Sequence, residues 1–294
     1  MEVGLTLPLA PGHSRELFLE WCRRIDDGPF SSLCQGERVA YPSLDLMTAL
    51  AAAATVTDRV RLIATVVVLP AHQTIPLAKQ AATIDVLSTG RLTLGVGVGG
   101  RPEDYAAFDI PFLRRHQRLD EQIAVLKRVW SGEAPAEGVG PVGPTPLQPG
   151  GPPILAGAMG PKALARAAQW ADGVNGFELA PGREPMDRYF RAAESAWAEA
   201  GRSSPPRLTT SAWFALGADG EERLRAYARK YLAFMGDEMA EGAAAMVRLD
   251  SGDTVRAALD EAAEAGCDEF MLVPTITDPT ELDRVVEVVS AWRS

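Results

Sequence analysis

Two glycine-rich stretches lie where predicted strands end, and each has a spacing that could hold a bound group. The first, Gly95–Gly100 (GVGVGG), formally fits the GxGxxG pattern of dinucleotide-binding folds. That pattern requires a helix that opens on its third glycine and an acidic residue about 20 residues later, at the end of a second strand. Here Pro102 follows, and the acidic residues at that distance fall within a predicted helix. A dinucleotide site is therefore disfavoured. Two interpretations of these alternating glycines remain. They allow a flat ring to approach the backbone closely, or they are the small residues that a crowded barrel corner needs.

The second stretch is a turn between a predicted strand and a predicted helix. It consists of Gly157, Ala158, Met159 and Gly160. Pro161 at the first helical position leaves free N–H groups at the positive end of the helix dipole, and Lys162 adds a charge. The pattern indicates a phosphate cradle, with an ordinary tight turn as the alternative.

Titratable side chains also occur at predicted strand ends. Glu37 and Arg38 follow the second strand, and His72 follows the third. In a barrel these positions lie at the rim where active sites are built, so a catalytic or substrate-orienting role and a surface ion pair are both open. The three histidines and three cysteines share no metal-ligand spacing, and no GxSxG motif occurs, so we expect no metal centre.

Short apolar runs alternate with helical patterns along the whole chain. The eight predicted strands are Val3–Leu7, Ser31–Cys34, Arg61–Leu69, Arg91–Val98, Ile154–Ala156, Gly173–Phe177, Leu208–Leu216 and Glu269–Val273. The third is apolar on both faces, which is typical of a parallel sheet covered on each side. Eight strand–helix units predict one α/β domain over residues 1–294, a (β/α)8 TIM barrel, with an open doubly wound sheet as the competitor.

The helical patterns that separate the strands have similar regularity. They cover Glu16–Arg24, Leu44–Val56, Leu77–Leu87, Leu113–Trp130, Pro161–Trp170, Glu184–Ala200, Glu221–Val247, Thr254–Ala265 and Thr280–Trp292. The stretch Glu221–Val247 is long and interrupted, and a loop containing Pro102 and Pro111 precedes Leu113. One segment, residues 132–153, cannot be regular structure, because 13 of its 22 residues are Pro or Gly. It is predicted to be a long barrel loop or a linker.

The composition limits the partners and the compartment. The 294 residues contain 29 Lys and Arg against 39 Asp and Glu, a formal net charge of −10. This acidity argues against nucleic acid or an anionic membrane as a partner. The longest apolar runs are shorter than a membrane span, no signal peptide is evident, and the three cysteines form no disulfide pattern. We therefore expect a cytoplasmic protein.

The segment Ile84–Gly97 (IDVLSTGRLTLGVG) resembles the central motif of the luciferase-like monooxygenase superfamily. Flanking stretches agree in order: Gly36-Glu37-Arg38, Tyr41-Pro42-Ser43, Arg61–Pro70, Ala78–Ala82, Gly151–Gly157, Ala171-Asp172-Gly173 and Ala265–Phe270. The resemblance spans nearly the whole chain. It implies a TIM barrel that binds FMN or the deazaflavin coenzyme F420 and performs redox chemistry on a small organic substrate.

The resemblance also implies roles for individual residues. Ala64, Thr65 and Val66 correspond to a bulge behind the flavin-like ring, which in several relatives contains a non-prolyl cis peptide. Gly97, Val98 and Gly99 would border the ring or its side chain, and the turn from Gly157 to Gly160 would hold the phosphate. Glu37 and Arg38 stand where relatives often have Glu-His or Asp-His near the substrate.

Arg38 departs from that pattern, because arginine stays charged and cannot shuttle protons as histidine does. His72 is a candidate substitute. A composition rich in Ala, Arg and Gly indicates a source with a GC-rich genome, where relatives that use F420 are common, and this favours F420 and hydride transfer over FMN. With FMN, monooxygenation and a separate flavin reductase are expected, and relatives are usually homodimers. Two alternatives remain: a non-catalytic or weakly flavin-binding barrel subunit, and a sugar-phosphate aldolase or isomerase, which the lack of Lys in any strand core disfavours.

Overall fold

The computed structural model describes residues 1–293 and places its strands in one parallel sheet. The strands are β1 (Glu2–Thr6), β2 (Ser32–Gln35), β3 (Arg61–Ala64), β4 (Val67–Val68), β5 (Leu92–Gly97), β6 (Ile154–Gly157), β7 (Gly173–Asn175), β8 (Arg207–Phe214) and β9 (Glu269–Pro274). Their order is β3-β2-β1-β9-β8-β7-β6-β5-β4, and pairing of β3 with β5 closes the sheet into a barrel. The predicted (β/α)8 barrel is therefore confirmed, and the open sheet is excluded.

One predicted strand differs from the expectation. Arg61–Leu69 is not continuous, because the chain leaves the ladder at Thr65 and Val66 and returns as β4. Both β3 and β4 pair with β5, so together they occupy one of the eight strand positions. The Thr65–Val66 peptide is cis, as the family resemblance implied.

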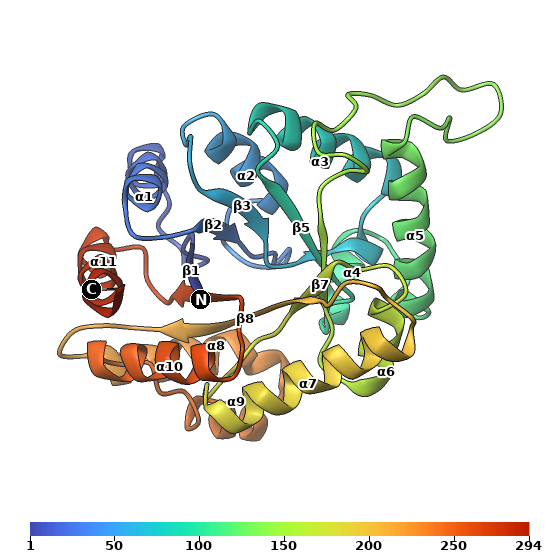
Figure 1. The fold of residues 1–294 in the computed structure, drawn as a ribbon. Helices are drawn as coiled ribbons and strands as arrows, with labels where there is room; N and C mark the ends of the chain where they lie inside the picture. Colours follow the sequence, from blue (N-terminus) through green and yellow to red (C-terminus); the bar gives the residue numbers. More distant parts are fainter. Residues whose placement is uncertain (294) are drawn as a thin grey trace.

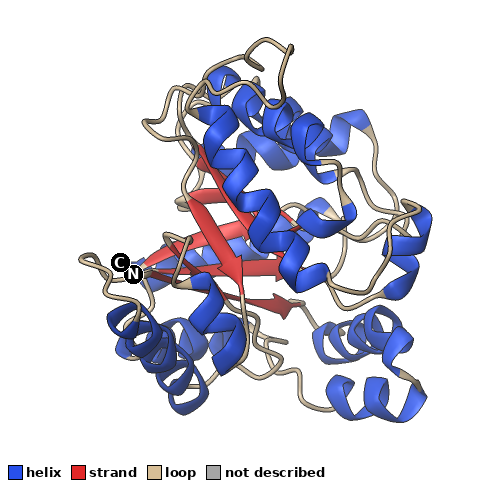
Figure 2. Cartoon of the chain, turned by 90° about the vertical axis from the view of Figure 1, so that its right-hand side faces the viewer, coloured by secondary structure: helices blue, strands red, loops and turns tan. Residues whose placement is uncertain are grey.

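Helices surround the strands on the outside (Figures 1 and 2). They are α1 (Arg15–Asp27), α2 (Leu46–Ala54), α3 (Thr74–Leu87), α4 (Pro102–Ala107), α5 (Arg115–Trp130), α6 (Pro161–Ala167), α7 (Arg183–Glu199), α8 (Gly220–Leu232), α9 (Asp237–Ala244), α10 (Gly252–Glu264) and α11 (Pro279–Arg293), with two 3-10 turns, η1 (Leu69–Ala71) and η2 (Ala233–Met235). The helical stretch Glu221–Val247, which was predicted to be interrupted, divides into α8, η2 and α9, and Gly236 before α9 has a φ of +93°, which favours glycine. Helix α4 was predicted as loop, although Pro102 at its first turn and the acidic Glu103 and Asp104 are typical of a helix start.

Apolar side chains fill two layers. The larger layer lies between the strands and the surrounding helices, where each helix buries one face. Inside the barrel a second cluster forms from Cys34, Ile63, Leu155 and Met271, contributed by four different strands. The barrel is thus a packed core, and ligands have access only at its ends.

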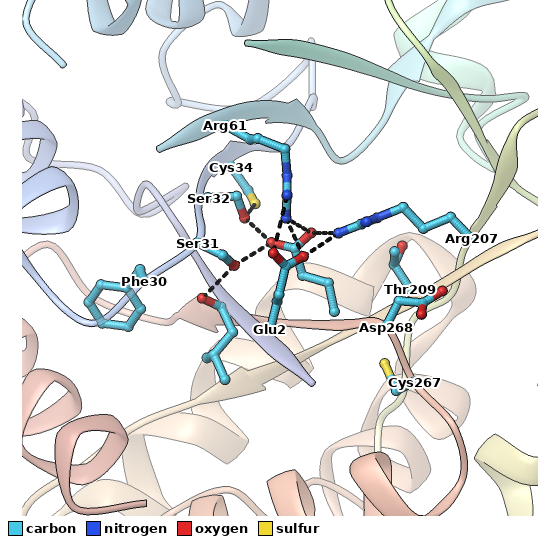
Figure 3. A network of polar contacts seen from close by, with 12 residues as sticks. Glu2, Phe30, Ser31, Ser32, Cys34, Arg61, Arg207, Thr209, Cys267 and Asp268 are labelled. Carbon is cyan, nitrogen blue, oxygen red and sulfur yellow. Dashed lines mark hydrogen bonds and ion pairs between the residues drawn. The ribbon is translucent and has the colours of Figure 1, made fainter. Parts of the chain in front are cut away.

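The amino ends of the strands carry an ion-pair network, which we call the barrel base (Figure 3). Glu269 is fully buried, and its Oε2 accepts hydrogen bonds from Arg61 at 2.8 Å and Arg207 at 2.9 Å. Its Oε1 accepts from the hydroxyls of Ser31 at 2.7 Å and Ser32 at 2.6 Å. All four lone-pair positions of this buried carboxylate are satisfied, so the barrel base is structural.

Residues 132–153 contain no helix or strand, as predicted, and project from the barrel between α5 and β6 (Figure 1). The fully buried Asp85 of α3 anchors the end of this loop. Its carboxylate accepts from the backbone N–H groups of Leu147 at 2.7 Å and Gln148 at 3.0 Å. The buried acid in the IDVLSTGR motif therefore holds a loop in place. No helix within residues 1–293 is long and apolar enough to cross a membrane.

Candidate functional site

The bulge between β3 and β4 lies at the carboxyl end of the barrel, where TIM-barrel active sites occur. Within the stretch from residue 62 to residue 71, only Thr65 and Val66 are not buried. Their neighbours in the adjacent strand are glycines that make room for them. A Cβ atom at Gly97 would lie 2.8 Å from Val66 Cγ2, and one at Gly95 would lie 2.1 Å from the carbonyl oxygen of Ala64.

These distances explain the alternating glycines of the sequence. Gly99, with a φ of +60°, continues the series, since its Cβ would lie 2.7 Å from a methyl group of Val68. The residues of the bulge therefore fill the space beside these glycines. Thr65 and Val66 themselves remain partly exposed to solvent. Contact of Gly97, Val98 and Gly99 with a ring stays a prediction.

Glu37 and His72 meet directly behind the bulge. Oε2 of Glu37 accepts a hydrogen bond from the backbone N–H of Val68 at 2.6 Å, and Oε1 lies 2.8 Å from His72 Nε2. The Glu37 side chain is 5% exposed and that of His72 is 15% exposed. Because a carboxylate oxygen accepts, the geometry assigns the proton to His72 Nε2. Two residues that are 35 positions apart therefore form one pair that fixes β4.

Arg38 lies elsewhere, although it is the next residue after Glu37. Its guanidinium is stacked 4.2 Å from the ring centre of Tyr41 and 4.5 Å from that of Tyr231. Nη1 also donates to the backbone oxygen of Tyr231 at 3.1 Å. Arg38 thus connects the end of α8 to the barrel rim. The Arg101 guanidinium carbon also lies over the Tyr231 ring, 5.3 Å from its centre.

A cavity of about 180 Å³ opens beside the bulge. The strand ends contribute Thr6, Gly36, Thr65, Phe177, Ser211, Trp213 and Val273, and neighbouring segments add Leu9, Tyr231 and Leu232. Trp213 forms edge contacts with Phe177 at 4.7 Å and with Tyr231 at 5.0 Å between ring centres. We call this space the rim cavity. Sequence reasoning missed its aromatic wall, because Tyr231 lies far along the chain in a helix.

The turn from Gly157 to Gly160 closes the other side of the bulge. A Cβ at Gly157 would lie 3.3 Å from Val66 Cγ2, whereas one at Gly160 would meet no described atom within 4 Å. Ala158 is buried and its carbonyl oxygen accepts from the Tyr189 hydroxyl at 3.0 Å, while Met159 is exposed. The turn is therefore firmly held at Ala158 and open at Gly160.

A second cavity, of about 660 Å³, borders Gly160 and is lined by His116, Lys162 and Arg166. Burial and the nearby charges of Arg115 and Arg166 lower the pKa of His116. The Arg166 guanidinium is paired with the carboxylate of Asp120, which leaves Lys162 as the cationic lining side chain without an ion pair among the described residues. An anionic group such as a phosphate fits this position beside Gly160 and Lys162.

A sequence profile of luciferase-like monooxygenases matches residues 3–277, nearly the whole chain. The chain belongs to this family. This luciferase-like protein is similar to an uncharacterized protein of Mycobacterium tuberculosis, with 35% identity over 178 residues that cover 56% of this chain and 60% of that protein. It is also 32% identical over 195 residues, or 59% of its length, to a putative coenzyme F420-dependent oxidoreductase of the same organism. That match covers 55% of the relative, so the similarity spans little more than half of these proteins.

Solved structures resemble the luciferase-like protein over almost all of its length. The monooxygenase RslO1 from Streptomyces bottropensis has a TM-score of 0.77 and 25% identity, and the match covers 99% of this chain and 97% of that one. The coenzyme F420-dependent tetrahydromethanopterin reductase of Methanopyrus kandleri has a TM-score of 0.75 with 19% identity, covering 98% and 97%. The oxygenating constituent of 3,6-diketocamphane monooxygenase from Pseudomonas putida, in complex with FMN, has a TM-score of 0.73 with 17% identity, covering 99% and 97%. The last two similarities concern the fold.

Glu178 is a titratable residue of the luciferase-like protein that sequence reasoning missed. It follows β7 just beyond Phe177, so the strand-end rule that selected Glu37 would have selected it too. Burial raises the pKa of Glu178, and the charge of Arg188 only partly offsets this. Its carboxylate is therefore less stable in the folded protein than in the unfolded chain.

We expect the Glu178→Gln variant to be more stable than the wild type at neutral pH. A carboxyl group whose pKa is raised on folding costs stability once pH exceeds its unfolded value of 4.5, and the cost grows until pH passes the folded pKa. Urea unfolding at pH 4 and pH 7 measures the difference, which should be small at pH 4 and larger at pH 7. Glu184→Gln, on the exposed start of α7, is the matched control; an equal gain there would contradict the burial argument.

Proposed function

We propose that this luciferase-like protein is an oxidoreductase that binds a flavin-type cofactor beside the bulge and acts on a small organic substrate. Coenzyme F420 is the preferred cofactor, with FMN as the alternative. The observation that carries the proposal is the accessible Thr65–Val66 surface, which lies between glycine-bearing strands and leads to the open turn at Gly160. A planar ring needs such a flat surface, and its phosphate needs a cationic neighbourhood.

The residues present fit such a group. Thr65 and Val66 would support one face of the ring, and Gly160, with Lys162 and Arg166 nearby, would hold the phosphate. The cofactor would supply two-electron chemistry: hydride exchange with the substrate for F420, or oxygen chemistry for FMN reduced by a separate reductase. The F420-dependent description of one mycobacterial relative supports the first choice. We also propose that the protein is a homodimer.

The protein's own side chains would chiefly position and shield. Glu37 holds the N–H of Val68 and the proton on His72 Nε2, which keeps the bulge in one conformation. Both carboxylate oxygens are engaged, so we propose that Glu37 and His72 act on the bulge rather than as a free general base. Arg38, bound to Tyr231, would keep the end of α8 over the rim cavity and exclude water.

Titration of the protein with F420 and with FMN, followed by tryptophan fluorescence, tests the proposal. We expect tight binding of one of the two. The Gly160→Val variant should fold normally, because its side chain enters open space, yet should weaken binding by blocking the approach of the phosphate. Lys162→Ala should weaken binding about three- to tenfold, the loss of one hydrogen bond whose charge is screened because Lys162 is exposed to solvent.

Lys230→Ala on the exposed face of α8 is the matched control and should leave the affinity unchanged. Failure of both cofactors to bind would overturn the proposal and favour the non-catalytic barrel subunit. Binding that is unaffected by Gly160→Val and by Lys162→Ala would place the phosphate elsewhere.

A further inference from the structure

Aromatic side chains at the barrel rim form a continuous series of ring contacts. The series begins at Trp213, which lines the rim cavity and is 5% exposed. The centre of its indole ring lies 5.0 Å from the centre of the Tyr231 ring, which in turn lies 6.0 Å from the centre of the Tyr41 ring. Tyr41 belongs to the segment between β2 and α2 and is partly exposed to solvent. These three rings, which we call the aromatic chain, connect the rim cavity with the protein surface.

The aromatic chain consists of the two residue types whose rings lose one electron most readily, tryptophan and tyrosine. Phe177 also contacts Trp213, at 4.7 Å between ring centres, but a phenyl ring is much harder to oxidise than an indole or a phenol. Electrons pass quickly between rings in contact, because tunnelling weakens steeply with distance. An oxidising equivalent on Trp213 therefore has a path through Tyr231 and none through Phe177.

The proton of each phenol decides which tyrosines can take part, because a tyrosine loses its proton when it is oxidised at neutral pH. Tyr227 lies as close as the others, 5.5 Å from Trp213 and 5.7 Å from Tyr231 between ring centres. Its hydroxyl is buried without a hydrogen-bond partner among the described residues, and burial raises the pKa of Tyr227 well above its ordinary value. Tyr231 and Tyr41 are only partly buried, so their protons can pass to water. Tyr227 is thus a neighbour of the aromatic chain and not a member.

Two arginines favour a neutral radical on the tyrosines. The Arg38 guanidinium carbon lies 4.2 Å from the centre of the Tyr41 ring and 4.5 Å from that of the Tyr231 ring. Arg101 lies over the Tyr231 ring as well. These cations repel a positively charged radical on Trp213, whereas a tyrosyl radical that has lost its proton is neutral. The charges therefore favour movement of the oxidising equivalent from the indole to the phenols.

We propose that the aromatic chain carries oxidising equivalents from the rim cavity to the surface and so protects the site against oxygen-derived radicals. A peroxyl radical at the barrel mouth takes one electron and one proton from the Trp213 indole and becomes a hydroperoxide. Tyr231 then gives an electron to the Trp213 radical and releases its phenolic proton to water, while the indole nitrogen regains a proton. Tyr41 reduces the Tyr231 radical in the same way. A soluble reductant such as ascorbate restores Tyr41 by supplying one electron and one proton.

This inference goes beyond the proposed function, because it concerns one-electron oxidation of the protein and needs no bound cofactor. Pulse radiolysis of the cofactor-free protein in azide solution tests it. Azidyl radicals oxidise tryptophan, and the indolyl and tyrosyl radicals are followed separately by their absorbance. We expect tyrosyl radicals to form in a first-order step whose rate is independent of protein concentration, and part of this step to be lost in Trp213→Phe.

The variants of the tyrosines locate the path. Tyr231→Phe keeps the ring and its contacts with the arginines, and it should lose the same part of the step as Trp213→Phe. Tyr41→Phe should still form a tyrosyl radical, but its repair by ascorbate should be slower than in the wild type. Tyr227→Phe is the matched control, since it makes the same change in an adjacent ring, and it should transfer like the wild type. Circular dichroism and urea unfolding check that each variant is folded.

The absence of a first-order step, or transfer that is unaltered in Tyr231→Phe, would overturn the proposal. Loss of transfer in Tyr227→Phe would overturn the assigned path. The titrations with F420 and FMN decide the proposed function independently. If neither cofactor binds but transfer depends on Trp213 and Tyr231, the redox function fails while the aromatic chain stands. If a cofactor binds and transfer is absent, only the inference about the aromatic chain fails.

Discussion

Replacing Glu269 by leucine is expected to lower the free energy of unfolding by about 3 kcal/mol, the lower end for removing one partner of a buried ion pair. Glu269 is fully buried and accepts from two guanidinium groups and two hydroxyls. Leucine would remove all four bonds at once. The loss stays at the lower end because the Arg61 and Arg207 side chains are 32% and 36% exposed and keep Glu2 as a partner.

Equilibrium unfolding in urea measures this loss. Glu2→Gln is the matched control, since Glu2 contacts the same two arginines at 2.5 Å but is 43% exposed. We expect that variant to cost less than about 1 kcal/mol, as exposed ion pairs usually do. A Glu269→Leu protein as stable as the wild type would show that desolvation of the buried carboxylate cancels its four hydrogen bonds.

Replacing Gly95 by alanine is expected to cost about 3 kcal/mol of stability, the upper end for inserting one methyl group into a packed core. The new Cβ would lie 2.1 Å from the carbonyl oxygen of Ala64, and no side-chain rotation can relieve contact with a backbone atom. Gly97→Ala should cost less, because its Cβ would meet a methyl group of Val66 at 2.8 Å.

The two glycines should also differ in whether a second substitution restores stability. Val66→Ala removes the methyl group that meets Gly97 and leaves a Cβ at 3.9 Å, an ordinary contact. The Gly97→Ala/Val66→Ala double variant should therefore be more stable than the sum of its single changes, and the same second change should not rescue Gly95→Ala. Thermal and urea unfolding of the five variants provide the comparison. Additive effects for Gly97 and Val66 would contradict direct packing between them.

Most of the fold could be predicted because the pattern that produces it is local. Apolar runs and amphipathic periods place strands and helices within a few residues of where they lie, since burial of one face depends on neighbours in the sequence. Prediction failed where an element depended on a distant one. Arg61–Leu69 reads as one strong strand, and only the missing side chains of Gly95 and Gly97 in the adjacent strand leave room for the bulge that divides it.

The candidate site could likewise be predicted only in part from the sequence. Glu37, Arg38 and His72 could be selected from the sequence because residues after parallel strands gather at one end of a barrel. Which of them meet was decided by closure of the sheet. His72 reaches Glu37 across 35 residues, while Arg38 turns to Tyr231 across 193 residues.

The sequence by itself thus determined the eight strand–helix units, the strand ends that carry polar groups, and the positions of the alternating glycines beside the bulge. Tertiary structure alone decided the partners of those groups and the aromatic wall around Trp213 and Tyr231. The physical reason is that side-chain hydrogen bonds and ring contacts depend on ångström distances between segments far apart in the chain, which no local period encodes.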